Sequence, residues 1–176
     1  MNRRATLTLT TIALVCLTVA LPAGLAVAQQ KQHVSYKTSA SNTKYVQQLN
    51  VNAGDAPSHI VRVFDLTRNH HDDSISINGI KLVEETARGV TDIIDGNGSA
   101  VFYSVFTMEN GDKFFARSVQ ASTGEAGTIT AIAAGPITGG TGKFEKIHGV
   151  VKTAVKFNVT SGFNEGTTDI DYSIGE

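Results

Sequence analysis

Residues 100–120 read AVFYSVFTMENGDKFFARSVQ. Two runs rich in aromatic and β-branched residues flank the sequence ENGD, whose central Asn-Gly favours the tight turn of a β-hairpin. Ala100–Met108 and Lys113–Gln120 are therefore predicted to be paired antiparallel strands. A second turn sequence, DGNG at residues 95–98, predicts another hairpin that joins Val90–Ile94 to the first of these strands.

The same alternation of short apolar runs with Gly, Asn and Asp continues along most of the chain, and no stretch keeps a helical period. In the run from Ile147, apolar residues occupy every second position while Lys152 and Lys156 fall between them, so one face of this strand is predicted to be buried. Antiparallel strands buried on one side close most economically as a barrel or a sandwich, and the pattern leaves both open. The remaining predicted strands are Tyr45–Val51, His59–Leu66, Ser74–Ile77, Gly127–Ala133, Ile147–Thr160 and Thr168–Ile174.

The N-terminus has the three parts of a secretory signal peptide. Arg3 and Arg4 precede the apolar run from Leu7 to Val19, and Ala26-Val27-Ala28 supplies the small residues of a cleavage site. We therefore expect residues 1–28 to be removed and the protein to be secreted or periplasmic, in the manner of a bacterial export substrate. The alternative is a retained membrane anchor, which the shortness of the apolar run disfavours.

Cys16 is the only cysteine, so removal of the signal peptide leaves residues 29–176 without disulfides or thiolate ligands. A lipid anchor on Cys16 is disfavoured because Val15, which is not a small residue, precedes it. The remaining length suits one domain, and it has no basic block that would indicate a nucleic-acid partner. The polar lead at residues 29–43 is predicted to be either flexible or an edge strand.

A glycine-rich stretch, GPITGGTGKF, occupies residues 135–144. A phosphate-binding loop would need glycine at Ile137 and Ser or Thr at Phe144, and the spacing of a dinucleotide fingerprint is also absent. We therefore interpret Gly139, Gly140 and Gly142 as a tight turn between strands, and we predict no cofactor.

This segment carries a resemblance to known proteins. Ile137–Glu145, followed by Gly149, is similar to the Gly-Gly-Thr/Ser-Gly-x-Phe segment of allene oxide cyclases and dirigent proteins. Upstream, Gly98–Phe106 and Phe114–Gln120 stand where those families have paired strands, so the resemblance covers roughly Val90 to Thr160. It implies an all-β fold, a single antiparallel β-barrel of about eight strands around an apolar cavity.

The resemblance also implies a function. These barrels hold a reactive apolar intermediate in one conformation while it cyclises or couples, and they often form trimers, so the expected partners are a small apolar molecule and, in a homotrimer, further copies of the chain. After signal cleavage we expect no contact with a membrane. The cyclases use a cysteine that the mature chain lacks, so their catalytic residues do not transfer. The alternative is a non-catalytic barrel that binds a hydrophobic ligand or serves as a surface interaction module.

Polar residues that interrupt the apolar strands are candidates for a site in the barrel lumen. The catalytic candidates are Arg88, Asp92 and Arg117. Arg117 leads because it alternates with Phe115 and Val119, and on an interior face it would have to pair with an acid or bind an anion. The alternative for Arg88 and Asp92 is an outward, solvated position.

The ligand-binding candidates are the aromatic residues Tyr103, Phe115 and Tyr172. Tyr103 shares a face with Val101 and Val105, so the alternative is a core tyrosine whose hydroxyl group is satisfied.

Two further polar groups receive structural interpretations. Residues 69–73 read NHHDD, but adjacent residues of an extended chain point apart, so we predict a solvated loop and no metal site. Glu84 and Glu85 are likewise predicted to lie on a polar rim.

Overall fold

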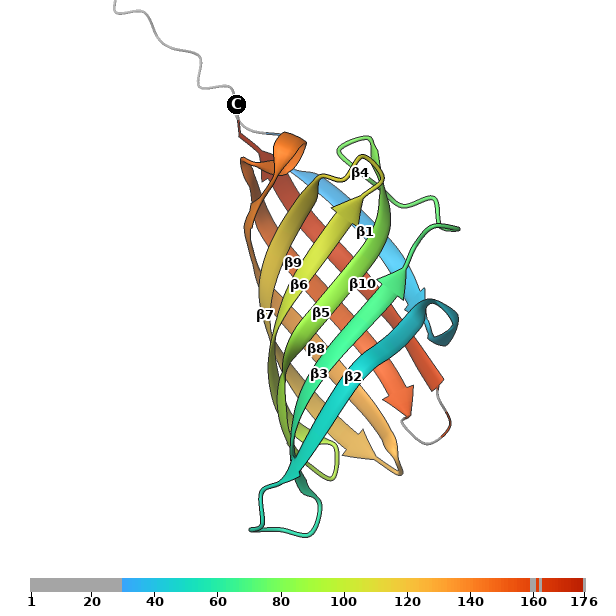
Figure 1. The fold of residues 1–176 in the computed structure, drawn as a ribbon, viewed down its shortest axis with the longest axis vertical. Helices are drawn as coiled ribbons and strands as arrows, with labels where there is room; N and C mark the ends of the chain where they lie inside the picture. The colour runs from blue at the N-terminus through green and yellow to red at the C-terminus, as the bar shows by residue number, and fades with distance from the viewer. Residues whose placement is uncertain (1–29, 159–160, 162, 176) are drawn as a thin grey trace, which may run out of the picture.

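The computed structural model describes residues 30–158, 161 and 163–175, and the predicted signal peptide lies outside these residues. These residues form β-strands and two short 3-10 helices (Figure 1). The elements are β1 (Gln32–Ser39), η1 (Ala40–Asn42), β2 (Thr43–Asn52), β3 (His59–Asn69), β4 (Ser76–Ile77), β5 (Ile80–Ile94), β6 (Asn97–Met108), β7 (Lys113–Glu125), β8 (Thr128–Gly140), η2 (Gly142–Phe144), β9 (Ile147–Asn158) and β10 (Phe163–Ile174).

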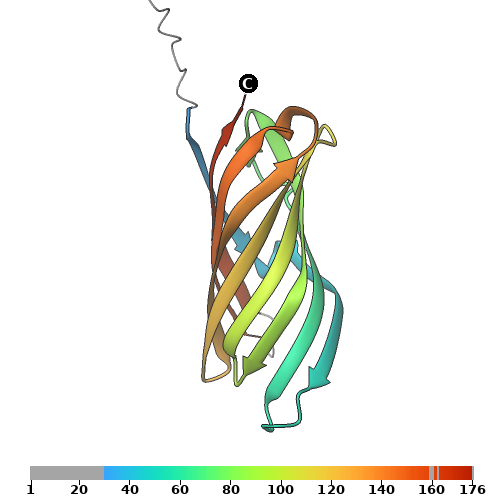
Figure 2. The same cartoon turned by 90° about the vertical axis from the view of Figure 1, so that its left-hand side faces the viewer.

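All strand pairs are antiparallel, and the sheet has the order β1-β10-β9-β8-β7-β6-β5-β3-β2, with β4 paired to β5. The sheet curves into an elongated barrel shape whose strands are tilted to the long axis (Figures 1 and 2). The all-β antiparallel prediction is confirmed, but the described residues form ten strands and their sheet does not close, because β1 and β2 are its two edges. We call the boundary between these edges the seam; η1 crosses it and connects β1 to β2.

The predicted hairpins at residues 95–98 and 109–112 are present between β5 and β6 and between β6 and β7. The polar lead contains β1, so it forms an edge strand. The largest difference between the predicted and the observed strands is in β5, which begins at Ile80, whereas the sequence predicts a strand that begins at Val90. Glu84, Glu85 and Arg88 interrupt its apolar pattern, and a register shift between Leu82 and Glu84 breaks the alternation of faces.

Side chains fill the upper half of the barrel, which is the half nearer the C-terminus in Figure 1. The Phe106 and Phe114 rings stack with centroids 4.4 Å apart, and Phe144 packs against Phe114 at 5.7 Å. All three side chains are fully buried. The rest of this core consists of Tyr36, Ile77, Ile80, Leu82, Met108, Ala116, Ile137, Ile147, Val151, Ile170 and Tyr172.

The glycine-rich segment lies where β8 turns into β9, as the sequence predicts. Gly142 has φ +55°, the left-handed region that favours glycine, and η2 then places Phe144 in the core. Gly140 allows a close approach of the backbone: a Cβ atom there would lie 2.4 Å from the Phe144 carbonyl oxygen and 2.8 Å from that of Lys113. The glycines thus bring the chain close enough to pack Phe144.

This close contact gives a stability prediction. Gly140→Ala forces the two carbonyl groups apart, and we expect it to destabilise the fold by about 1–3 kcal/mol, as other overpacked sites do. Thr138→Ala, an exposed change two residues away, is the control and should cost less than about 0.5 kcal/mol. Urea unfolding of both variants measures the difference, and equal midpoints would show that the turn accommodates a methyl group.

Neither 3-10 helix, and no other helix among the described residues, is long and apolar enough to cross a membrane.

Candidate functional site

The lower half of the barrel contains an open cavity, and the empty space in and around it, open solvent included, is about 960 Å³. Its walls are formed by residues of β2, β3 and β5 to β10, which surround the lumen. Apolar side chains make up most of the lining, with Phe64, Phe102 and Phe157 as the largest. The other lining residues are Tyr45, Arg62, Leu66, Arg68, Glu85, Ala87, Thr91, Ile93, Gln120, Ser122, Ile129, Ala133, Thr153, Val155 and Asn164.

A buried ion pair lies where the cavity meets the packed core. Arg68 on β3 and Glu85 on β5 face the lumen, and Arg68 Nη1 donates to Glu85 Oε1 at 2.9 Å. The side chains are 9% and 4% exposed, so both charges are almost fully removed from water. The Tyr36 hydroxyl of β1 donates to the other carboxylate oxygen, Oε2, at 3.2 Å. Glu85 therefore links β1, β3 and β5 near the seam.

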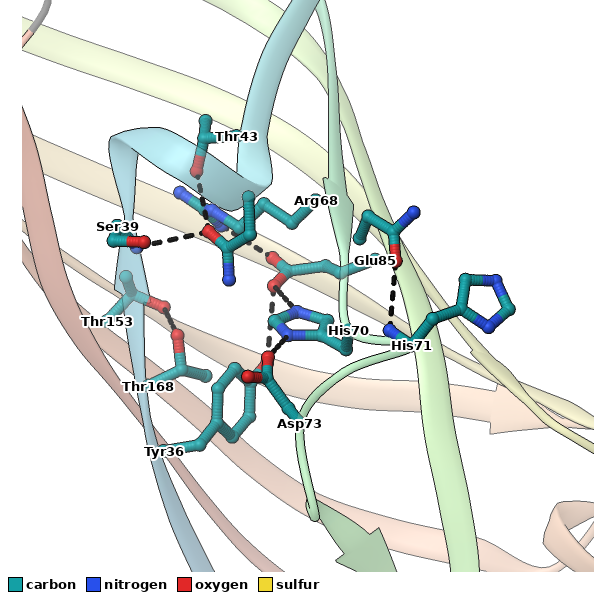
Figure 3. Close-up of polar contacts among 12 residues, drawn as sticks. Tyr36, Ser39, Thr43, Arg68, His70, His71, Asp73, Glu85, Thr153 and Thr168 are labelled. Carbon is teal, nitrogen blue, oxygen red and sulfur yellow. Dashed lines mark hydrogen bonds and ion pairs between the residues drawn. The ribbon is translucent and has the colours of Figure 1, made fainter.

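His70, directly after β3, extends this cluster (Figure 3). Its side chain is completely buried, and its Nδ1 lies 2.8 Å from Asp73 Oδ2 while its Nε2 lies 4.0 Å from Glu85 Oε2. The Tyr36 ring packs edge-on against the imidazole, with centroids 5.2 Å apart. We call Tyr36, Arg68, His70, Asp73 and Glu85 the buried polar cluster.

The cluster shifts the pKa values of its members. Burial opposes ionisation of Glu85, but the Arg68 guanidinium and the His70 imidazole outweigh burial and lower the pKa of Glu85. Burial also disfavours the charged form of His70, but Glu85 and Asp73 outweigh it and raise the pKa of His70. Burial and the nearby Glu85 carboxylate raise the pKa of Tyr36 well above its usual value. Glu85 is therefore a carboxylate, and Tyr36 keeps its proton.

The raised pKa of His70 predicts a pH-dependent stability. The contribution of protonated His70 to the stability of the fold is fully present below the pKa of an unfolded histidine, about 6.5. It is lost as pH rises through the higher pKa of His70 in the folded protein. We expect the melting temperature of the wild type to fall over this interval, and His70→Gln to remove that part of the fall. His71→Asn changes the exposed neighbour and serves as the control. If the melting temperatures of the wild type and His70→Gln changed equally with pH, His70 would not be the source of the pH dependence.

Three residues that line the cavity each have a buried side-chain atom without a hydrogen-bond partner among residues 30–158, 161 and 163–175. The atoms are Arg68 Nε, Thr91 Oγ1 and Asn164 Oδ1. A buried donor without a partner costs about 1–3 kcal/mol, so a hydrogen-bond acceptor that reached Arg68 Nε would remove this cost. Within the same part of the chain, no three His, Cys, Asp or Glu side chains gather as metal ligands.

Two sequence interpretations are wrong here. The sequence predicts a solvated loop for His70 and a polar rim for Glu85, but both are buried in the cluster. Arg68 is not among the residues that the sequence analysis selects. The sequence does contain a sign of its position. Arg68 follows the apolar Leu66 by two residues, so both side chains lie on the same face of the strand, which is the inward face.

The predicted catalytic residues lie on the outside of the sheet and are not brought together in the cavity. Arg88 pairs with Asp65 on the outer face at 2.9 Å. Asp92 bonds His59 Nε2 at 2.7 Å, also outside. Arg117 is exposed, since its inward neighbours on β7 are the buried Ala116 and Ser118. Arg117 does share a face of β7 with Phe115 and Val119, as predicted, but this is the outer face of the sheet.

The predicted ligand-binding aromatics also lie outside the cavity lining. Tyr103 is 44% exposed and stacks on Phe115 with ring centroids 6.2 Å apart, so the interpretation of Tyr103 as a core residue is wrong. Tyr172 is buried in the upper core, where its hydroxyl donates to Gln32 and accepts from the Asn78 N–H, both at 2.7 Å. These contacts fix the end of β10 and give Tyr172 a structural position.

Comparisons with known proteins find similarity in solved structures alone. No family model matches the chain, and no curated protein matches it. The pterocarpan synthase dirigent protein GePTS1 has a TM-score of 0.49 and 18% identity over 84% of this chain and 88% of its own. For the pterocarpan synthase dirigent protein PsPTS1, the TM-score is 0.48 and the identity 18%, over 84% of this chain and 97% of its own. Both are dirigent proteins, a group that the glycine-rich segment resembles.

Proposed function

We propose that this protein binds a small, mostly apolar molecule in the lower cavity, with one hydrogen-bond-accepting group of that molecule directed at Arg68. The observation that carries the proposal is the contrast between apolar walls and a single buried, unpaired guanidinium donor. Apolar pockets with few, fixed polar groups are the usual form of a small-molecule site. The Arg68–Glu85 pair holds the donor in place before any ligand arrives.

Two matched ligands test this proposal. N-phenyl-1-naphthylamine serves as a fluorescent reporter, and 2-acetonaphthone and 2-isopropenylnaphthalene compete with it for the cavity. The two competitors have nearly the same shape, because a methylene group replaces the carbonyl oxygen, but only the ketone accepts a hydrogen bond. A hydrogen bond to a charged donor is worth about 1.5–3 kcal/mol, so we expect the ketone to bind about tenfold more tightly or better. Absence of reporter binding, or equal affinity of the two competitors, would refute the proposal.

We further propose that the bound molecule is a reactive intermediate whose cyclisation or coupling the cavity guides. The supporting observation is that Glu85, an ionised carboxylate, lines the cavity and is linked to the protonated Tyr36 and to His70. Such a group stabilises positive charge on a bound molecule and accepts a proton from it.

The test compares molecules extracted from the purified wild type and from Glu85→Gln, which keeps the shape of the side chain. If the cavity guides the reaction, the molecules recovered from the two proteins are expected to differ in chemical structure or in configuration, which separation on a chiral column detects. The same molecule from both proteins would leave binding as the function of the cavity.

A further inference from the structure

A second hollow, which we call the seam hollow, adjoins the lower cavity at the edge strand β2. Both spaces are lined by the same four residues, Tyr45, Arg62, Phe157 and Asn164. The other residues of the seam hollow come from η1, β2 and the neighbouring ends of β9 and β10; they are Ala40, Thr43, Gln48, Asn158 and Phe163. A ligand in the lower cavity can therefore extend into the seam.

The inward row of β3 has an arginine at each end of an apolar stretch. Arg62, Phe64, Leu66 and Arg68 alternate along this strand, so their side chains share one face, and all four line the lower cavity. Arg68 lies at the packed core, whereas Arg62, six residues earlier, borders the seam hollow. The two charged ends of the row therefore lie at different ends of the cavity.

The charge of Arg62 is not balanced by an acid. Its Nε donates to Asn50 Oδ1 at 2.7 Å, which is a neutral acceptor, and its Nη groups have no hydrogen bond to any residue that the structure describes. By contrast, Arg68 is paired with Glu85. Glu85 is also the only acid among the described residues that line the two spaces. A half-buried guanidinium without a counter-ion favours binding of an anion.

The same charges decide where on the row an anion binds. A carboxylate at the Arg68 end would lie beside the Glu85 carboxylate, and the like charges would repel each other. No acid lines the seam hollow, and the Nη groups of Arg62 are the donors that remain for a carboxylate. Because Phe157 lines both spaces, the molecule that carries the anion has apolar contacts next to its charged group.

We propose that the ligand of the lower cavity is an organic anion whose apolar body lies among Phe64, Phe102 and Phe157 and whose carboxylate pairs with Arg62 in the seam hollow. This inference rests on the proposed binding of a mostly apolar molecule in the cavity. It adds the charge of that molecule and the side of the barrel at which the charged end lies. Arg62 is then a residue that determines specificity.

Two competitors that differ in charge test this assignment. The anion is 3-(2-naphthyl)propanoate, and 3-(2-naphthyl)propanamide has nearly the same shape without the charge. We expect the Kd of the carboxylate for the wild type, from displacement of N-phenyl-1-naphthylamine, to be at least tenfold lower than the Kd of the amide. Arg62→Gln is expected to remove this preference, whereas Arg62→Lys keeps the positive charge and should retain part of it.

Arg88→Gln is the matched control, since it removes the same charge from the outer face of the adjacent strand β5 and should leave the preference unchanged. Melting curves establish that each variant is folded. A second measurement covers an Arg62→Gln variant that does not fold. The Nε–H signal of Arg62 in NMR spectra of the wild type, identified by its absence from Arg62→Lys, is expected to shift with the carboxylate and to stay in place with the amide.

Equal Kd values of the two competitors for the wild type, or a preference that survives Arg62→Gln, would overturn this inference. If 2-acetonaphthone still displaces the reporter in such a case, the proposed binding of an apolar molecule stands and only its anionic group is refuted. If the wild type does not bind the reporter at all, the proposed function falls, and this inference falls with it.

Discussion

Glu85→Ala is expected to destabilise the protein by about 3–5 kcal/mol, the usual result of removing one partner from a buried ion pair. The change leaves the Arg68 guanidinium without its carboxylate in a site where both side chains are less than 10% exposed. It also removes the acceptor of the Tyr36 hydroxyl and the carboxylate near His70. For a chain of this size the melting temperature should fall by about 10 °C or more.

Glu84→Ala is the matched control because Glu84 is the adjacent residue, has the same chemistry and is exposed. We expect this change to stay within about 0.5 kcal/mol of the wild type. A double variant, Arg68→Met/Glu85→Leu, removes both charges together and should recover much of the stability lost in Glu85→Ala. Similar effects of the changes at Glu84 and Glu85 would contradict the burial of the pair.

Ala133→Trp is expected to abolish reporter binding while the protein stays folded. Ala133 on β8 is 4% exposed and lines the cavity, so an indole side chain there occupies the space that we assign to the ligand. We expect the Kd of N-phenyl-1-naphthylamine to rise at least tenfold, which corresponds to about 1.4 kcal/mol. Fluorescence titration measures the Kd, and a melting curve shows that the variant is folded.

Ala134→Trp adds the same side chain one residue later, on the outer face, and should leave the Kd unchanged. If Ala133→Trp unfolds the protein, Ile129→Trp tests the same cavity with a smaller increase in volume. Binding that is lost in Ala134→Trp and retained in Ala133→Trp would place the ligand outside the barrel.

The sequence predicts the strands well where turn residues separate them. The Asn-Gly at residues 110–111 and the glycines around Gly140 mark real turns, because positive φ and close backbone approach restrict these positions to few residue types. The predicted strand Val90–Ile94 covers only the end of β5, because Glu85 and Arg88 interrupt the apolar pattern before it. The sequence does not show that a charged residue such as Glu85 points inward unless its buried partner is known. The missing partner was Arg68, 17 residues earlier in the chain.

The candidate site was predicted less well, for a related reason. Alternation places Arg117, Phe115 and Val119 on one face, but alternation does not say which face is inside. In the middle of β7 the inward side chains are small, with Ala116 and Ser118 buried, while the larger Val119 is exposed. Size and hydrophobicity therefore indicate the wrong face of this part of the strand.

The central claim is that the ligand occupies the lower half of the barrel and leaves the upper half packed. Methyl-resolved NMR during a titration with 2-acetonaphthone tests it most directly. We predict that the methyl signals of Ile93, Ile129 and Ala133, which line the cavity, shift with a single binding curve, while those of Ile77 and Ile80 in the upper core stay in place. Shifts confined to the outward methyl groups of Val101, Val119 and Ile132, with no change at Ile93, Ile129 and Ala133, would contradict it.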